Sequence, residues 1–282
     1  MKPITLFILI LTFLLPSNQT LSAEISADKW VVTIEGKIER GDYEKLISIL
    51  KKQTISVVSI FSTGGDFFEA IKIGKIIRKL KITVHTALEF PDLNIFQHNA
   101  KSISNAKCVS ACFLVWVSGA KRGGNIVGIH RPYLSNNALK NMKADDAEAL
   151  YVAIREATAL FLSQMGVHKI YLDKMFSTPS TDVNWLTIDE IQNDFGPLSG
   201  MDEWTSSKCY KIMSREDLAR YNVFWNKLME KPNTLPAQTL SKRGMNEYTN
   251  LLGKELKFQE CKTREWAYLI GDTWHEWRSS IQ

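Results

Sequence analysis

Hydrophobic and polar residues follow two different periods along the first third of the chain. Short β-branched runs at 30–35, 57–61 and 82–86 have the composition of β-strands. Between them, 41–50 and 66–80 repeat apolar residues at helical spacing, with charged residues on the opposite face of the second segment. This strand, helix, strand, helix, strand order with short connections predicts parallel strands joined by helical crossovers.

The regular alternation stops at 88–107, which is rich in polar residues and predicts a long loop. A plain surface insertion is favoured, and a lid beside the Ser110 segment is the alternative. Residues 112–117 are apolar on every side, so a helix starting near Ser110 should be buried in the core. A strand at 126–129 then ends at His130, and 144–165 has the pattern of a long amphipathic helix.

Further along, 185–190 predicts the start of a short helix, in which Thr187 and Glu190 fit a capping box. After about Gly200 the composition changes, and five of the eight tryptophans lie there. We therefore expect an α/β core of repeated β-α-β units over 24–200 and a tryptophan-rich helical extension over 201–282.

The N-terminus has the pattern of a secretory signal peptide. Lys2 precedes an apolar run at 4–15, and a small-residue exit ends at Ala23. We expect cleavage after Ala23, which makes 1–23 the signal and places the mature protein in the periplasm or outside the cell. An uncleaved anchor stays open as an alternative. No second segment is long and apolar enough to span a membrane, so none is expected after cleavage.

Charge and ligand patterns exclude several classes of function. The chain has 35 basic and 30 acidic residues, a formal net charge of +5, and no block of Lys and Arg. Nucleic acid is therefore not an expected partner. No group of His and Cys has the spacing of zinc ligands, so no metal site is expected.

The four cysteines, in an exported chain, favour disulfides. Pairing Cys108 with Cys112 and Cys209 with Cys261 is the most natural of three possible connectivities, and the sequence does not choose among them. A bridge between positions i and i+4 strains a regular helix, so Cys108–Cys112 requires a distorted turn. The equal alternative is a pair of small buried thiols beside Ser110.

Three segments together contain the groups of a serine hydrolase. Ser110 lies where a buried helix begins, and His130 follows a strand. A serine hydroxyl is a weak nucleophile and needs such a neighbouring base. The turn at Gly64 and Gly65 lacks Cβ atoms, so its N–H groups and that of Ala111 can approach an oxyanion.

The same segments carry a family resemblance. A strand ends in Ser62-Thr-Gly-Gly65, small residues surround Ser110 in Val109-Ser-Ala111, and Gly119-Ala-Lys-Arg122 precedes His130-Arg-Pro132. In this order the stretch 30–196 resembles the Clp protease/crotonase superfamily, and most closely its exported Clp-protease-like branch. The resemblance implies a crotonase-like α/β core. The Cys-Val-Ser-Ala-Cys run departs from the glycine-rich pattern of that family.

The resemblance also implies a triad aspartate shortly before an aromatic-Leu-Ser/Thr helix start. Trp185-Leu-Thr187 matches that start, and Asp182 lies three residues ahead of it. An ungapped register places Val183 at the aspartate position, so the turn must differ by one residue if Asp182 is the match. Asp173 is a weaker substitute.

The expected function is thus an exported serine peptidase or related hydrolase. Ser110 is the expected nucleophile, His130 the base and Asp182 the orienting carboxylate, with Gly64, Gly65 and Ala111 as the candidate oxyanion hole. No cofactor is implied, and the expected partner is a peptide or protein substrate. Because members of the superfamily often assemble into oligomers, the resemblance also implies a homo-oligomer as a candidate assembly.

Alternatives from three other classes stay open. A Ser/Lys dyad peptidase would use Lys107 or Lys121, which are near in sequence, although His130 in its Arg-Pro context favours the triad. A non-catalytic binding or scaffold protein could keep the same fold. An acyl-CoA enzyme is compatible with the Gly-Gly turn, but an exported compartment disfavours coenzyme A as a substrate.

Overall fold

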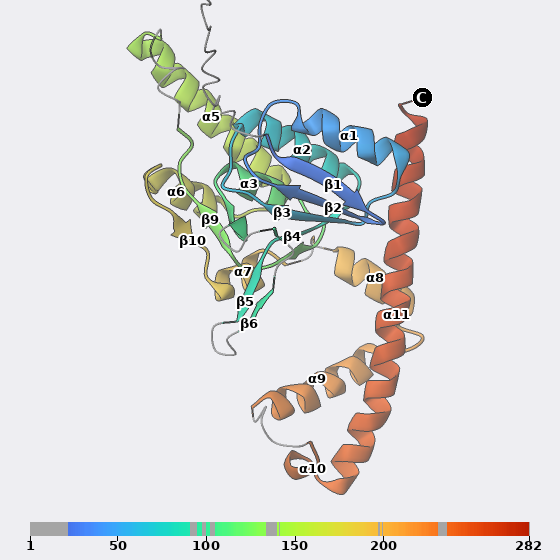
Figure 1. Ribbon diagram of the computed structural model, residues 1–282. Helices are drawn as coiled ribbons and strands as arrows, with labels where there is room; N and C mark the ends of the chain where they lie inside the picture. The colour runs from blue at the N-terminus through green and yellow to red at the C-terminus, as the bar shows by residue number, and fades with distance from the viewer. Residues whose placement is uncertain are drawn as a thin grey trace, which may run out of the picture.

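The structure is a computed structural model that describes residues 22–90, 95–97, 100–101, 105–133, 140, 142–196, 198, 200–230 and 236–281. Figure 1 shows a mixed α/β core with a helical C-terminal stretch along one side. Most of the predicted signal segment lies outside the described residues, as do parts of the predicted loop at 88–107. The signal therefore stays a prediction, and so does the choice between a surface insertion and a lid.

The main sheet has five strands in the order β1-β2-β3-β4-β8. Its strands are β1 (Glu24–Asp28), β2 (Val31–Glu35), β3 (Val57–Phe61), β4 (Thr83–His85) and β8 (Arg122–Gly123). The strands from β2 to β8 are parallel, as the alternating pattern predicts, and β1 adds an antiparallel edge. No sequence pattern predicted β1.

A second, smaller sheet has the order β10-β9-β7 and lies beside the first. It is formed by β7 (Cys108–Val109), β9 (Val127–Ile129) and β10 (Asn184–Trp185), with β7 and β9 parallel. Trp185 therefore belongs to a strand, where the sequence predicted the start of a helix. The main-chain bonds from Ser62 N–H to Lys107 and from Val109 N–H to Ser62 join this sheet to the end of β3.

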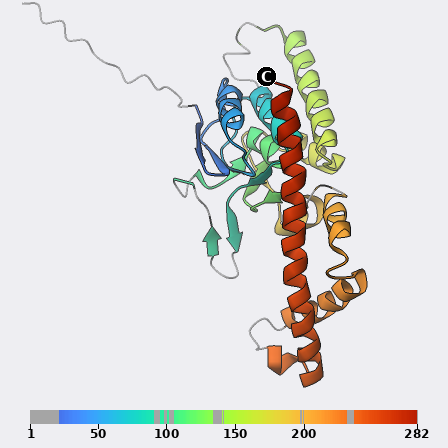
Figure 2. The ribbon, with the colours of Figure 1, turned by 90° about the vertical axis from the view of Figure 1, so that its right-hand side faces the viewer.

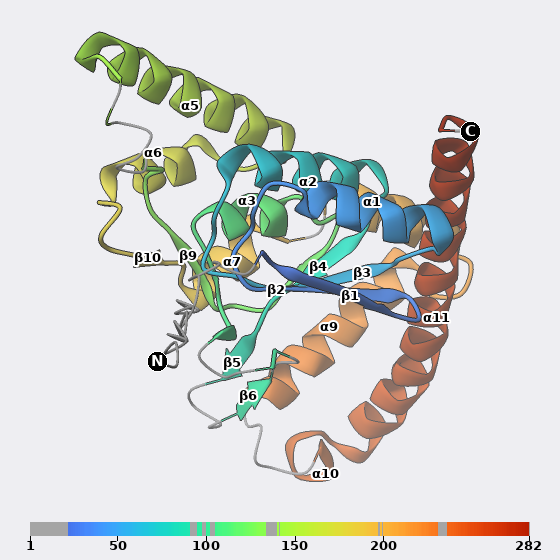
Figure 3. The ribbon, with the colours of Figure 1, turned by 45° about the horizontal axis from the view of Figure 1, so that its top comes forward.

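Helices α1, α2 and α3 cover one face of the main sheet (Figure 3). The helices are α1 (Asp42–Lys52), α2 (Phe67–Lys79), α3 (Ala111–Val117), α5 (Ala144–Gln164), α6 (Lys169–Ser177), α7 (Ile188–Asp194), α8 (Met201–Cys209), α9 (Arg215–Met229), α10 (Pro236–Thr239) and α11 (Lys242–Ser279). All residues of α3 are buried, as its apolar sequence predicts.

Local capping fixes where two of these helices begin. Asp66 accepts a hydrogen bond from the N–H of Glu69 at the start of α2. At the start of α7, Thr187 and Glu190 form the predicted capping box. The first cap also fixes the turn between β3 and α2, which contains Gly64 and Gly65.

The segment 88–107 is more regular than its polar composition predicts. Its described part contains two short strands, β5 (Leu88–Phe90) and β6 (Ile95–Gln97), paired as an antiparallel hairpin. The main-chain pairing of a hairpin does not depend on an apolar face, so the sequence pattern gave no signal for it. In Figure 1 this hairpin projects from the same side of the core as α9 and α10.

The long helix α11 connects the core to the rest of the C-terminal stretch (Figure 2). Near its C-terminal end, Trp266, Ile270, Trp274 and Trp277 join the main hydrophobic core. Farther toward its N-terminus, Leu251, Phe258 and Cys261 form a second apolar cluster with Cys209 and Met213. Within the described ranges, no helix combines the length and the apolar character that crossing a membrane requires.

Candidate active site

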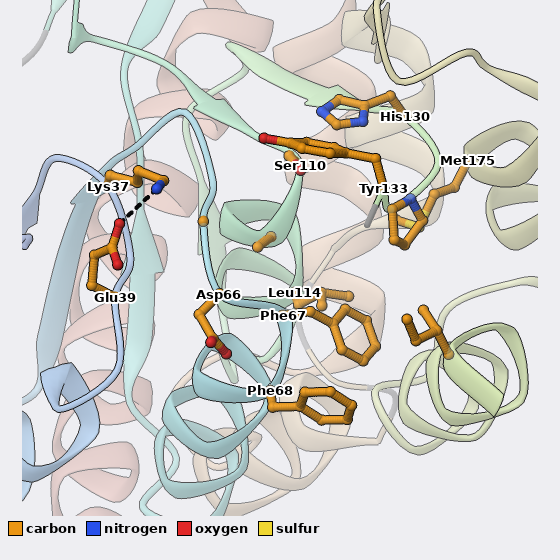
Figure 4. A pocket seen from close by; sticks show the side chains of 14 residues that line it. Lys37, Glu39, Asp66, Phe67, Phe68, Ser110, Leu114, His130, Tyr133 and Met175 are labelled. Atoms are coloured by element: carbon orange, nitrogen blue, oxygen red, sulfur yellow. Dashed lines mark ion pairs between the residues drawn. The ribbon is translucent and has the colours of Figure 1, made fainter. Parts of the chain in front are cut away.

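A pocket of about 320 Å³ opens where several strands end (Figure 4). Its walls come from the segments that follow β2, β3, β7 and β9, together with α5 and α6. Loops at the carboxyl ends of parallel strands are the usual place for ligand sites in α/β folds. Ser110, Ala111, Gly65 and His130 all line this pocket, so the structure brings four of the predicted site residues together.

Ser110 occupies a sharp turn between β7 and α3. Its φ of 61° and ψ of −126° put a non-glycine residue at positive φ, which costs on the order of 1–3 kcal/mol. A strand, a strained serine and a buried helix form the geometry that presents a nucleophile in hydrolases of the α/β class. The turn also provides the distortion that an i, i+4 bridge requires, and Cys108 and Cys112 are bonded across it.

The glycine turn lies directly against this serine. A Cβ added to Gly64 would lie 2.7 Å from Ser110 Cβ and 3.0 Å from Ser110 Oγ. A Cβ on Gly65 would lie 2.0 Å from the carbonyl oxygen of Ile38. Both glycines have positive φ, so close approach and backbone conformation each require glycine here.

The two glycines have different roles in hydrogen bonding. Gly64 donates its N–H to Ser62 Oγ at 3.1 Å, and its carbonyl accepts from Ile38 N–H at 2.8 Å. Among the described residues, by contrast, nothing accepts from the N–H of Gly65 or of Ala111. The candidate oxyanion donors are therefore Gly65 and Ala111, whereas Gly64 provides the space for the serine.

His130 is buried and follows directly after β9. Its Nδ1 lies 2.9 Å from the carbonyl oxygen of Arg131. Because a carbonyl can only accept, Nδ1 carries a proton, and Nε2 of the neutral ring keeps a lone pair that can accept one. Figure 4 shows His130, Ser110 and Tyr133 at one end of the pocket.

Asp182 does not line the pocket, and among the described residues no hydrogen bond joins it to His130. Its side chain is exposed and accepts from the N–H of the adjacent Val183 at 2.8 Å. The position that the resemblance assigns to a carboxylate, at Nδ1 of His130, is taken by the Arg131 carbonyl. The weaker substitute Asp173 pairs with Lys169 on the surface of α6.

The Ser110 hydroxyl makes no hydrogen bond within the described part of the chain. Contacts between nucleophile and base are often loose in the absence of substrate and tighten in the Michaelis complex. Ser110 and His130 therefore line the same pocket without a hydrogen bond between them in the described structure.

Most of the other residues that line the pocket were not predicted as site residues from the sequence. Its apolar lining consists of Phe67, Phe68, Leu114, Pro132, Tyr133, Ile154 and Met175. Lys37 and Glu39 come from the loop between β2 and α1 and form an ion pair at 2.6 Å. No motif marks these two residues, because their place in the pocket depends on how Ile38 pairs with Gly65.

The lysines considered for a dyad do not line this pocket. Lys121 lies over the Trp266 ring, 4.6 Å from its centroid, and Lys107 is absent from the lining. Lys37 does line the pocket, but its hydrogen bond to Glu39 and the Glu39 charge raise its pKa. A general base needs a lowered lysine pKa, so Lys37 is poorly suited to that role.

Among the residues that the structure describes, no cluster of His, Cys, Asp and Glu could hold a metal ion.

Both disulfides of the expected pairing are present, Cys108–Cys112 and Cys209–Cys261. The sequence left three connectivities open, and the structure selects this one.

No protein-family model matches the chain, and no curated protein matches it. Solved structures similar to it include a ClpP1 mutant from Listeria monocytogenes, with 18% identity, a TM-score of 0.39, and coverage of 59% of this chain and 87% of that one. A mutant of the 1510-N membrane-bound stomatin-specific protease with a substrate peptide is 14% identical, with a TM-score of 0.38 and coverage of 65% and 81%. A putative enoyl-CoA hydratase from Streptomyces coelicolor is 11% identical, with a TM-score of 0.30 and coverage of 71% of each chain. The order of strands and helices confirms the predicted α/β fold class.

Proposed function

We propose that this protein is a serine hydrolase, and most specifically a peptidase, in which Ser110 is the nucleophile and His130 the base. The observation that carries the proposal is the conformation of Ser110. A non-glycine residue held at positive φ between a strand and a buried helix, directly beside Gly64, is a costly arrangement with a known catalytic use.

The groups in the pocket support a complete acyl-transfer cycle. Ser110 Oγ attacks a substrate carbonyl carbon as Nε2 of His130 takes the hydroxyl proton. The N–H groups of Gly65 and Ala111 donate to the resulting oxyanion. His130 returns the proton to the leaving amine, and a water activated by the same nitrogen then hydrolyses the acyl-enzyme.

The orienting role is proposed for the Arg131 carbonyl in place of a carboxylate. It holds the Nδ1 proton of His130 and thereby fixes the tautomer that leaves Nε2 free. Arg131 itself is held by the bond from its N–H to the Thr178 carbonyl at 3.0 Å. A neutral carbonyl stabilises the imidazolium less than a carboxylate does, so we expect modest turnover.

The proposed substrate is a peptide or protein, because apolar side chains line one side of the pocket and the charged Lys37, Glu39 and Asp66 line the other (Figure 4). We also propose that the protein is exported and loses residues 1–23. The two disulfides support an oxidising compartment.

A fluorophosphonate probe tests the proposal, because it reacts with activated serines whatever the natural substrate is. We expect the purified wild type to be labelled, and Ser110→Ala and His130→Ala each to lose labelling while staying folded by circular dichroism. Thr178→Ala serves as a control near the base, since only its backbone carbonyl holds Arg131.

Two results would contradict the proposal. Labelling that persists in Ser110→Ala would place the activated serine elsewhere. A folded wild type that no probe concentration labels would favour a binding protein that keeps the fold without the chemistry.

A further inference from the structure

The Cys108–Cys112 disulfide joins the two arms of the turn that carries Ser110. Cys108 lies in β7 and Cys112 in the first turn of α3, with Cα atoms 5.3 Å apart. Val109, Ser110 and Ala111 are the whole of the loop that the bridge encloses. The covalent link therefore spans the strained residue from one side to the other.

Both arms are also held by the rest of the fold. On the strand side, Cys108 N–H donates to the Ile126 carbonyl, and Ser110 N–H donates to the Gly128 carbonyl. On the helix side, every residue of α3 is buried. The disulfide adds to these contacts a covalent constraint on the separation of the two arms across Ser110.

We propose that the Cys108–Cys112 disulfide is a positioning device that holds Ser110 at positive φ and its hydroxyl beside Gly64. A residue in a sparsely populated conformation stays there only when its surroundings over-determine it. Released, Ser110 can relax toward negative φ, which moves Oγ relative to His130 and to the Gly65 and Ala111 N–H groups. This inference rests on the proposed function and adds a structural requirement to it.

The length of the enclosed loop argues against a general stabilising role for this bridge. The stabilisation from closing a loop in the unfolded chain grows with the logarithm of the loop length. Cys108 and Cys112 are separated by 4 positions, whereas Cys209 and Cys261 are separated by 52. The short bridge therefore lowers the entropy of the unfolded chain less than the long one does. Its place in the fold is directly beside the nucleophile.

The two disulfides provide a matched pair of variants. All four cysteines are buried, so replacing either pair by alanine leaves a comparable cavity in an apolar site. Cys108→Ala/Cys112→Ala removes the proposed positioning device. Cys209→Ala/Cys261→Ala removes the bridge between α8 and α11, none of whose residues line the pocket.

The experiment measures fluorophosphonate labelling of Ser110 and the thermal midpoint of each variant, with labelling done well below every midpoint. For Cys108→Ala/Cys112→Ala we expect the saturating labelling rate to fall at least about tenfold, with little change in the probe concentration that gives half of that rate. For Cys209→Ala/Cys261→Ala we expect the wild-type labelling rate and the larger loss of thermal midpoint. A bridge that only stabilises the fold would not lower the labelling rate more while lowering the thermal midpoint less.

A second variant guards against misfolding. Cys108→Val/Cys112→Ala refills volume on the strand side with a residue that favours strands, and the same loss of labelling rate is expected. Wild-type labelling rates in either variant would overturn the positioning role and leave the proposed function intact. Failure of both variants to fold would overturn it as well, because the bridge would then be needed for the fold.

A wild type that is not labelled at Ser110 would be a different failure. It would remove the proposed function first, and the positioning role would fall with it.

Discussion

At the scale of single residues, the space beside Ser110 is the most sensitive feature of the site. Gly64 and Gly41 have nearly the same φ, 101° and 99°. They differ in their surroundings, because a Cβ at Gly64 would press on Ser110, whereas a Cβ at Gly41 would meet no atom within 4 Å.

Comparing alanine at these two positions separates backbone cost from site geometry. Both Gly64→Ala and Gly41→Ala should lose stability because alanine is strained at positive φ. Only Gly64→Ala should lose labelling by fluorophosphonate, by about 10²-fold or more, since it displaces the nucleophile. Equal labelling rates in the two variants would mean that Ser110 is not held against the glycine turn.

Asp182 allows a second prediction at this scale. A triad aspartate contributes about 10⁴-fold to turnover when it holds the histidine. Because Asp182 is exposed and the Arg131 carbonyl holds His130, Asp182→Ala should keep nearly the wild-type labelling rate. A loss of several orders of magnitude would show that Asp182 reaches His130 during the reaction.

Sequence motifs thus identify some residues of the candidate site and leave others unmarked. That Ser110, His130 and Gly65 line one pocket could be predicted, because each lies in a short motif with a mechanical reason for its residue types. The Arg131 carbonyl could not be, since every residue has a carbonyl and no pattern marks the one that will face a ring nitrogen. Lys37 enters the pocket only through the pairing of Ile38 with Gly65.

At the scale of elements, one buried carboxylate joins α1 to α2. Glu69 lies in α2 and accepts from the N–H groups of Gly41 and Tyr43, at 2.9 Å and 2.8 Å, where α1 begins. Burial opposes its ionisation, but these hydrogen bonds and the Lys72 ammonium outweigh burial and lower its pKa below the ordinary 4.5. The link fixes α2, whose first turn lines the pocket.

The lowered pKa predicts how stability changes with pH. The contribution of ionised Glu69 is fully present above the unfolded pKa near 4.5 and is lost as the pH falls through the lower native pKa. Glu69→Gln should cost roughly 1 to 2 kcal/mol at pH 7 and progressively less below pH 4.5.

Urea denaturation at pH 7 and near pH 3 measures this difference. Glu156→Gln, which changes an exposed carboxyl on α5, is the control and should follow the wild type at both values. A deficit of Glu69→Gln that is the same at both pH values would contradict the linkage.

Elements with a strong period were recovered from the sequence, and those without one were missed. The bounds of β3, which has a β-branched run, and of the amphipathic helix α2 are close to the predicted ranges. The edge strand β1 has a mixed sequence, and β5 and β6 have only three residues each. Their pairing depends on neighbours that no local pattern shows.

At the scale of the whole molecule, α11 is joined to the core by its tryptophans. Trp274 is 1% exposed and lies against Trp277, with ring centroids 5.7 Å apart. Lys81 and Thr273 add a hydrogen bond between the core and this helix. The sequence predicted a tryptophan-rich helical extension, although it did not show that one helix would run continuously from Lys242 to Ser279.

Truncating one tryptophan measures how strongly α11 is joined to the core. Trp274→Ala should lower the free energy of unfolding by about 3–5 kcal/mol, the usual range for a buried tryptophan. Trp225→Ala, which alters a tryptophan that is 45% exposed on α9, should change it by no more than about 1 kcal/mol. Chemical denaturation of both variants gives the comparison, and similar losses would show that the two tryptophans are equally buried.

The central claim is that this fold holds Ser110 as an activated nucleophile. The most direct test is to react the purified protein with a fluorophosphonate, digest it, and locate the adduct by mass spectrometry. The account predicts one adduct per chain, on Ser110 in the peptide that carries the Cys108–Cys112 bridge, and none in His130→Ala. An adduct on another serine, or none on the folded wild type, would contradict it.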